Sequence, residues 1–147
     1  MSKRSSIPVS EAKVIYPEHL VQPQDMLDFI YEDGFLDDWT ELGLNEDSDL
    51  PMFEFALTAN PESGDVISGT GGLRKIRWRT RGRGKRGGAR VLYLYVPEIF
   101  IVLVVMAYSK TDSDDLSEDA KKQLTTHCSL VRERLLTRYK AWRRPDE

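Results

Sequence analysis

The chain has 147 residues, 40% of them hydrophobic, and a formal net charge of −3 at pH 7, which suits one domain with a core and leaves little room for a second. Its longest apolar stretch, residues 99–107, is about half as long as a membrane span, and the N-terminus lacks an apolar run of signal-peptide length. The single cysteine, Cys128, excludes an intramolecular disulfide and fits a reducing compartment. We therefore expect a cytoplasmic protein without membrane contact.

The first residues differ in pattern from the rest of the chain. Residues 1–24 contain three prolines, Pro17 and Pro23 among them, and several small polar residues, and they show no sustained hydrophobic period. We expect a flexible N-terminal extension here, followed by one domain over residues 25–147.

The first half of this domain predicts one strand and two helices. Residues 27–31 alternate as a strand does, with Leu27, Phe29 and Tyr31 on one face. Residues 35–44 carry apolar side chains at helical spacing. A second helix is predicted from a cap at Asn45 to a stop at Asn60.

The second half changes to a period of two and then returns to a helix. Strands are predicted over residues 73–79, 89–96 and 99–108, the first two joined by a glycine-rich loop. The last helix is predicted to begin with Asp115 as its cap and to carry an apolar stripe. The stripe consists of Leu124, Cys128, Val131, Leu135, Tyr139 and Trp142. The order β-α-α-β-β-β-α predicts an α+β fold with a small, mostly antiparallel sheet.

Positive charge is concentrated in the middle of the chain. Residues 73–110 contain ten Lys or Arg and one carboxylate, whereas residues 1–72 contain three against fifteen. Such a local excess attracts a polyanion, which points toward nucleic acid.

The ordered part of this basic segment is the predicted strand over residues 73–79. Lys75, Arg77 and Arg79 share one face at intervals of about 7 Å, close to the spacing of successive phosphates along a nucleic-acid strand. A solvated sheet face and an acidic protein partner are the alternative explanations of this pattern. A solubilising face usually mixes both signs of charge, which favours phosphate. Further RNA-binding candidates are Arg74 on the strand, Arg81, Arg83, Lys85 and Arg86 on the loop, and Tyr108, which could stack on a base.

Other chemistries find little support. Gly84-Lys85 lacks the Ser or Thr of a phosphate-binding P-loop, and no glycine-rich dinucleotide motif joins a strand to a helix. His19, His127 and Cys128 do not have the spacing of zinc ligands, so we expect no metal and no cofactor. His127 is expected to be an exposed helix residue and Cys128 a buried apolar one.

Three combined motifs resemble the RelE/HigB branch of type II toxin–antitoxin toxins, in the RelE/ParE superfamily. They are Gly-Thr-Gly-Gly-Leu-Arg-Lys-Ile-Arg-Trp (69–78), Gly-Lys-Arg-Gly-Gly-Ala-Arg-Val-Leu-Tyr-Leu-Tyr (84–95), and Ala-Tyr-Ser-Lys (107–110) followed by Asp-Leu-Ser (115–117). The resemblance covers about residues 27–124 and is strongest after Pro61. Residues 1–24 and those beyond Tyr139 lie outside it.

The resemblance implies a ribosome-dependent mRNA endonuclease that works without a metal, through attack of a 2′-hydroxyl on the adjacent phosphate. On this basis Lys75, Arg77, Arg90 and Lys110 are the candidate catalytic residues. Like-charge crowding favours the neutral amine, so Lys75 is the candidate base. Arg77 and Arg90 would hold the phosphate, and Lys110 would assist the leaving oxygen or bind. The RelE tyrosine of the C-terminal helix has no clear counterpart in this sequence, and His127 does not match the HigB histidine securely.

The resemblance also implies partners. These are a helix-turn-helix antitoxin, the ribosome and mRNA, with DNA reached only indirectly through the antitoxin. Two other functions stay open at this point: a non-catalytic RNA- or ribosome-binding module, and a ParE-like toxin with a protein target. The phosphate-spaced basic row argues against the last, because a protein target does not require it.

Overall fold

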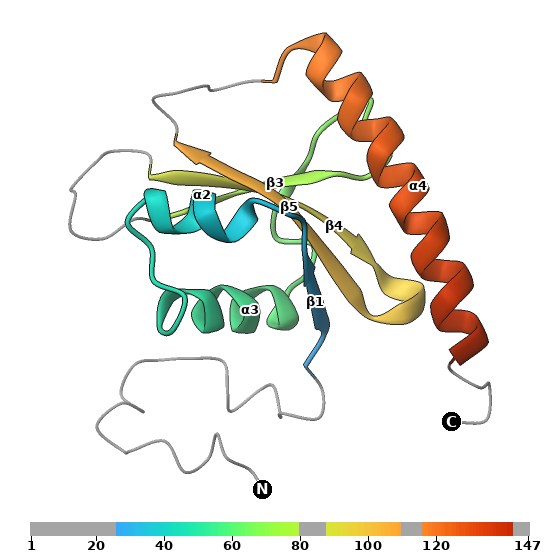
Figure 1. The fold of residues 1–147 in the computed structure, drawn as a ribbon, viewed down its shortest axis with the longest axis horizontal. Coiled ribbons are helices and arrows are strands. Elements are labelled where there is room, and N and C mark those ends of the chain that lie inside the picture. Colours follow the sequence, from blue (N-terminus) through green and yellow to red (C-terminus); the bar gives the residue numbers. More distant parts are fainter. Residues whose placement is uncertain (1–25, 80–87, 110–115, 143–147) are drawn as a thin grey trace, which may run out of the picture.

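The computed structural model describes residues 26–79, 88–109 and 116–142 (Figure 1). Its elements are β1 (Asp28–Tyr31), α2 (Phe35–Glu41), α3 (Asp49–Ala59), β2 (Asp65–Val66), β3 (Arg74–Trp78), β4 (Ala89–Val96), the 3₁₀ turn η4 (Pro97–Ile99), β5 (Ile101–Ser109) and α4 (Glu118–Trp142). The α+β class and the predicted order of the main elements are confirmed. The two-residue strand β2 was not predicted. None of the helices in the described ranges is long and apolar enough to cross a membrane.

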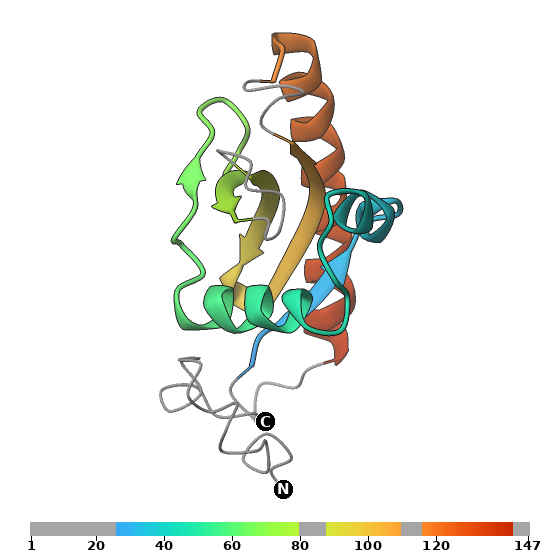
Figure 2. The same ribbon diagram turned by 90° about the vertical axis from the view of Figure 1, so that its left-hand side faces the viewer.

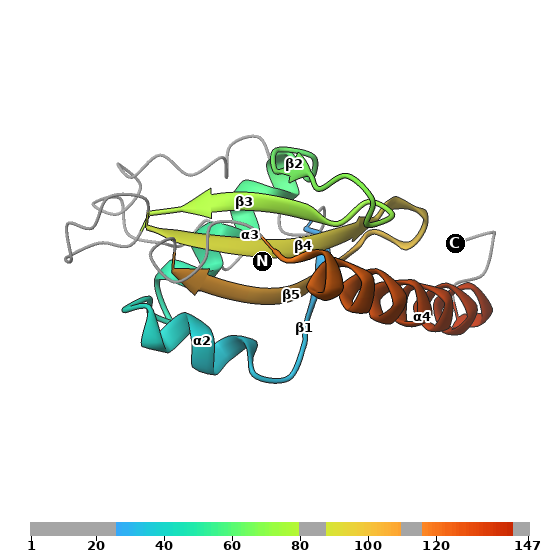
Figure 3. The same ribbon diagram turned by 90° about the horizontal axis from the view of Figure 1, so that it is seen from above.

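The five strands form one mixed sheet in the order β1-β5-β4-β3-β2. In Figure 3 strands β2, β3, β4 and β5 follow one another across the sheet. These neighbours pair antiparallel, as predicted, whereas β1 pairs parallel with β5. The parallel pair places β1 at one edge of the sheet, and the short β2 forms the other edge.

Helices α2 and α3 pack against one face of the sheet. Their core side chains meet those of Ile76, Val91 and Val102, which alternate with residues of the opposite face. A chain of aromatic contacts crosses this core, with ring centroids 5.1 to 5.7 Å apart. It runs through Tyr31, Phe35, Trp39, Phe53 and Trp78.

Helix α4 packs against the opposite face and runs beside the sheet as one long helix (Figure 2). The buried Cys128 and the partly buried members of the predicted stripe, Leu124, Val131, Leu135 and Tyr139, lie against Leu92, Leu94 and other strand residues. The predicted apolar stripe is therefore confirmed through Tyr139. For Trp142 the structure establishes only that it ends α4.

Polar contacts attach α4 to the rest of the domain. His127 lies 2.9 Å from the Glu32 carboxylate, between Nε2 and Oε2. Further along the helix, Arg132 donates to Glu98 at 3.2 Å, and near its start the Thr125 hydroxyl lies 3.3 Å from the carbonyl of Gly69. His127 is an exposed helix residue, as predicted. Its contact with Glu32 was not.

Two helix starts differ from the prediction. Helix α3 begins at Asp49, and the Asn45 side chain instead accepts hydrogen bonds from the backbone N–H groups of Asp47 and Ser48 in the preceding turn. Helix α4 begins at Glu118, and the Ser117 hydroxyl accepts from the N–H of Ala120. In both cases a Ser, Asn or Asp nearby offers an equivalent side-chain acceptor, so composition does not decide between them.

A β-bulge interrupts the pairing of β4 with β5. Leu92 pairs with Met106 and Tyr93 pairs with Val104, so Val105 is an extra residue on β5. After the bulge Arg90 pairs with Tyr108, which brings these two side chains to the same face of the sheet.

The burial of Cys128 predicts a protected thiol. Burial, and secondarily the Glu32 carboxylate, raise the thiol pKa from 9.0 to about 11, so the thiolate fraction near pH 8 falls about 100-fold. We expect iodoacetamide to alkylate the native protein at pH 8 about two orders of magnitude more slowly than the urea-unfolded chain. Mass spectrometry of the single cysteine measures both rates, and equal rates would contradict this packing.

Candidate functional site

Three polar side chains form a row across the α4 face of the sheet. Arg77 on β3 pairs with Arg90 on β4, and Arg90 pairs with Tyr108 on β5. Paired residues of antiparallel strands share a face, and adjacent strands lie about 4.8 Å apart. The three side chains therefore leave one face of the sheet from neighbouring strands.

A second row lies two residues along the strands and contains Lys75, Leu92 and Met106. Leu92 belongs to the apolar cluster beneath α4, whereas Lys75 is partly exposed at the margin. This face of the sheet is therefore divided in two. Its apolar half lies under α4, and its basic half lies toward the strand ends that are on the left in Figure 1.

The two arginines of the first row differ in exposure. Arg90 is only 5% exposed, while Arg77 is an exposed residue. Arginine is rarely buried to this extent, and like charges directly opposite each other on two strands are destabilising. An anion in front of the row would relieve this repulsion. The arrangement is well suited to phosphate, which arginine binds through its fork of N–H donors.

A polar clamp behind β3 holds the segment that leads into β2. The Tyr93 hydroxyl accepts from the N–H of Gly64 at 2.9 Å and donates to the carbonyl of Pro61 at 2.8 Å. Arg74, which pairs with Tyr93, donates through Nη1 to the carbonyls of Glu62 and Gly64 at 3.0 and 2.7 Å. The clamp fixes β2 as the edge strand beside β3.

The clamp leaves no room for a side chain at Gly64. A Cβ there would lie 2.9 Å from Cε1 and Oη of Tyr93 and 3.1 Å from the carbonyl of Lys75. The close approach brings β2 into register with β3, so that Asp65 becomes the cross-strand neighbour of Lys75. The sequence did not indicate that Asp65 lies opposite Lys75, because nothing in a two-residue strand indicates its pairing partner.

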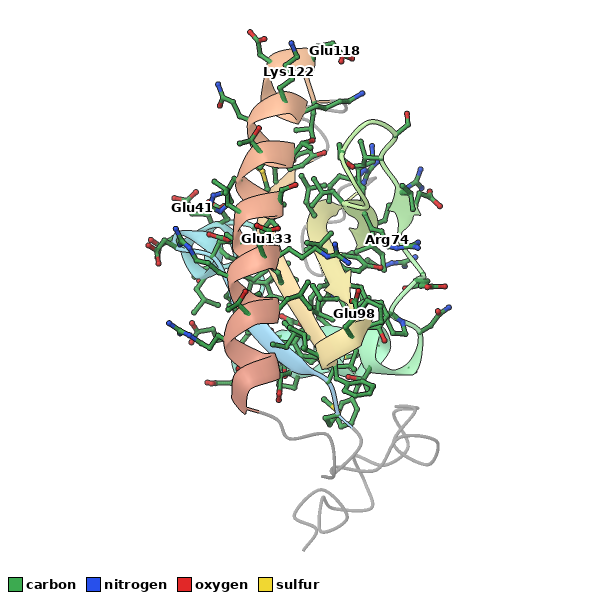
Figure 4. The ribbon with its side chains drawn as sticks, turned by 90° about the vertical axis from the view of Figure 1, so that its right-hand side faces the viewer. Glu41, Arg74, Glu98, Glu118, Lys122 and Glu133 are labelled. Atoms are coloured by element: carbon green, nitrogen blue, oxygen red, sulfur yellow. The ribbon has the colours of Figure 1, made fainter. Side chains whose placement is uncertain are left out.

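The structure brings together four of the candidates, Lys75, Arg77, Arg90 and Tyr108. It places Arg74 on the opposite face, where the backbone carbonyls of the clamp bind it (Figure 4). Arg79 is exposed just past the end of β3. Arg81, Arg83, Lys85, Arg86 and Lys110 lie outside the described residues.

Two other strand tyrosines, Tyr93 and Tyr95, lie on the face of the sheet that α2 and α3 cover. Tyr93 is fully buried, and burial is the main cause of its raised pKa. Tyr95 packs partly buried against the same core. Tyr108, the stacking candidate from the sequence, is the strand tyrosine that lies beside Arg90. Within the described ranges, no group of three or more His, Cys, Asp and Glu side chains is arranged to hold a metal ion.

Comparison with known proteins gave similar structures but no matching family model. A mutant of the Escherichia coli toxin RelE in the free state is 17% identical, with 60% of this chain and 88% of that chain covered and a TM-score of 0.45. The intact E. coli RelBE toxin–antitoxin complex is 18% identical, with 56% of this chain and 95% of that chain covered and a TM-score of 0.42. The isolated E. coli RelE toxin is 16% identical, with 68% of this chain and 97% of that chain covered and a TM-score of 0.42.

Removing the Tyr93 hydroxyl should loosen the clamp. In Tyr93→Phe the buried N–H of Gly64 and the carbonyl of Pro61 both lose a partner, which we expect to cost about 1–3 kcal/mol in the free energy of unfolding. Urea denaturation measures this change. Tyr95→Phe, on the same strand and partly exposed, is the matched control and should change stability by less than about 0.5 kcal/mol. Equal effects of the two changes would show that the hydroxyl contacts do not stabilise the segment.

Proposed function

We propose that this protein is the toxin of a toxin–antitoxin pair and acts as a ribosome-dependent mRNA endonuclease. The observation that carries the proposal is the row of Arg77, Arg90 and Tyr108, with Lys75 in the adjacent row on the same face. Cationic side chains from two strands can bind a phosphodiester, and the one aromatic side chain beside them can stack on the neighbouring base.

The proposed reaction is an internal transesterification of RNA. The 2′-oxygen forms a bond to the adjacent phosphorus, the bond from phosphorus to the 5′-oxygen breaks, and a 2′,3′-cyclic phosphate results. Lys75 accepts the proton of the 2′-hydroxyl. A second proton must reach the departing 5′-oxygen, and Lys110 is the candidate that the sequence offers for this.

Arg77 and Arg90 would stabilise the transition state. The pentacoordinate phosphorus gathers negative charge on its non-bridging oxygens, and guanidinium groups already in position stabilise that charge more than they stabilise the ground state. Arg90 is suited to this role because its burial fixes the side chain and lowers the local dielectric. Arg77, which is exposed, is suited to meet the incoming RNA.

The proposal includes partners. The antitoxin would be a small helix-turn-helix protein, and contact with DNA would pass through it. The ribosome would present the message. A reading frame of roughly 100 residues with a helix-turn-helix motif beside this gene would support the pairing.

Removing the cationic groups should abolish cleavage. With Lys75→Ala plus Arg90→Ala we expect growth arrest on induction to disappear, together with codon-aligned cuts mapped by primer extension. Each lost group should lower the rate about 10²–10³-fold. Because Arg90 is buried, Lys75→Ala plus Arg77→Ala tests the same proposal with more exposed side chains.

Arg134→Ala provides the matched control. Arg134 is an exposed arginine on α4, in the half of the helix that lies away from the basic rows, so its removal should leave cleavage unchanged. Thermal unfolding of each variant verifies that it is folded. If the wild-type protein cuts no message on translating ribosomes, the proposed activity is wrong. Binding without cleavage would favour the RNA-binding module.

A further inference from the structure

A pocket lies beside the basic rows, between the sheet and the first turns of α4. It has a volume of about 420 Å³ and is lined by Ile67, Lys75, Tyr108, Leu116, Glu118 and Lys121. This volume falls within the range of small-ligand sites. Because Lys75 lines the pocket and also belongs to the proposed phosphate site, a group bound in the pocket would be a close neighbour of the reacting phosphate.

The walls of the pocket come from three parts of the chain that are tied together. Ile67 belongs to the turn that leads into β3, and its N–H donates to the carbonyl of Leu73 at 2.8 Å. The Thr125 hydroxyl of α4 donates to the Lys121 carbonyl at 2.7 Å and lies 3.3 Å from the carbonyl of Gly69 in the same turn. Lys75 and Tyr108 rise from the sheet. These contacts hold the helix, the turn and the sheet around one space.

The lining combines flat apolar surface with one charged pair. Ile67, Leu116 and the Tyr108 ring offer surfaces on which a planar ring can stack. Glu118 and Lys121 lie side by side on α4, with 3.5 Å between Oε2 and Nζ. The Glu118 side chain is 88% exposed and that of Lys121 is 26% exposed, so both remain accessible from the solvent side. Figure 4 shows Glu118 at the start of α4, at the same end as Lys122.

A carboxylate beside an ammonium group distinguishes nucleobases by their edges. The carboxylate accepts hydrogen bonds only, and the ammonium group donates only. Guanine, adenine and cytosine each carry an exocyclic amino group next to an acceptor, so their edges complement the pair. Uracil carries no amino group, and its single N–H lies between two carbonyl oxygens, so when one of them accepts from the ammonium group the other lies against the carboxylate and repels it.

We propose that this pocket holds one nucleobase of the RNA beside the reacting phosphate, and that Glu118 and Lys121 select a base with an exocyclic amino group over uracil. The inference rests on the proposed function for its substrate, RNA. It adds two specificity residues on α4 to a pocket that shares Lys75 and Tyr108 with the rows on the strands. Glu118 and Lys121 take no part in bond making or breaking.

Binding of nucleoside 5′-monophosphates tests the pocket directly, without the ribosome. We expect AMP, CMP and GMP to shift the NMR signals of Ile67, Leu116 and Lys121, and UMP to bind at least about fivefold more weakly. In Glu118→Gln the amide both donates and accepts, so this preference should fall below about twofold. Asp119→Asn removes a neighbouring carboxylate that does not line the pocket and is the matched control.

Cleavage-site mapping on translating ribosomes forms the second part of the experiment. Wild-type cuts should avoid uracil at one position of the codon, and Glu118→Gln should relax that position. Equal affinity of the wild type for UMP and the other nucleotides would overturn the inference, as would equal effects of Asp119→Asn and Glu118→Gln. If the nucleotides are discriminated but no message is cut, the proposed function fails and the base pocket stands.

Discussion

The cross-strand register of β3, β4 and β5 is the constraint on which the other features of the molecule depend. Side chains alternate between the two faces, so this register decides at once which residues α2 and α3 bury, which α4 buries, and which remain for a ligand. Along β4, Leu92, Leu94 and Val96 face α4, and Arg90 continues the same series into the uncovered half. Core and candidate site therefore occupy adjacent parts of one surface, and the site inherits its rigidity from the core.

A rigid floor of this kind suits the chemistry that we propose. Phosphoryl transfer gains most from charged groups that are positioned before the reaction, since they need no reorganisation when charge develops. Strand residues supply such positions better than loop residues do. The glycine-rich loop carries four cations in the sequence, and the four candidates that the described residues bring together all lie on strands. Affinity and catalysis thus have separate sources in the proposed function.

Much of this arrangement could be predicted from sequence, because alternation is a local property. The pattern around Lys75 and Arg77 indicated both the strand and its basic face, and Ile76 and Trp78 do face α2 and α3. Features that depend on tertiary approach could not be predicted. The strand β2 exists because Arg74 and Tyr93 bind carbonyl and N–H groups of residues 61–64, and no side-chain pattern records those contacts. The burial of Arg90 and the pocket beneath the start of α4 likewise arise only when distant segments meet.

The bulge at Val105 determines which side chain reaches Arg90. In an uninterrupted pairing that continued from Tyr93 and Val104, Arg90 would face Ala107, and Tyr108 would point to the face that α2 and α3 cover. One additional residue thus exchanges a methyl group for a phenol at the centre of the candidate site. It follows that the bulge, rather than the composition of β5, decides which way the last residues of this strand face. Deletion of Val105 would give a regular ladder in which Met106 still faces Leu92 and Tyr108 still faces Arg90, whereas loss of the bulge at unchanged length would turn every residue from Met106 onward to the other face.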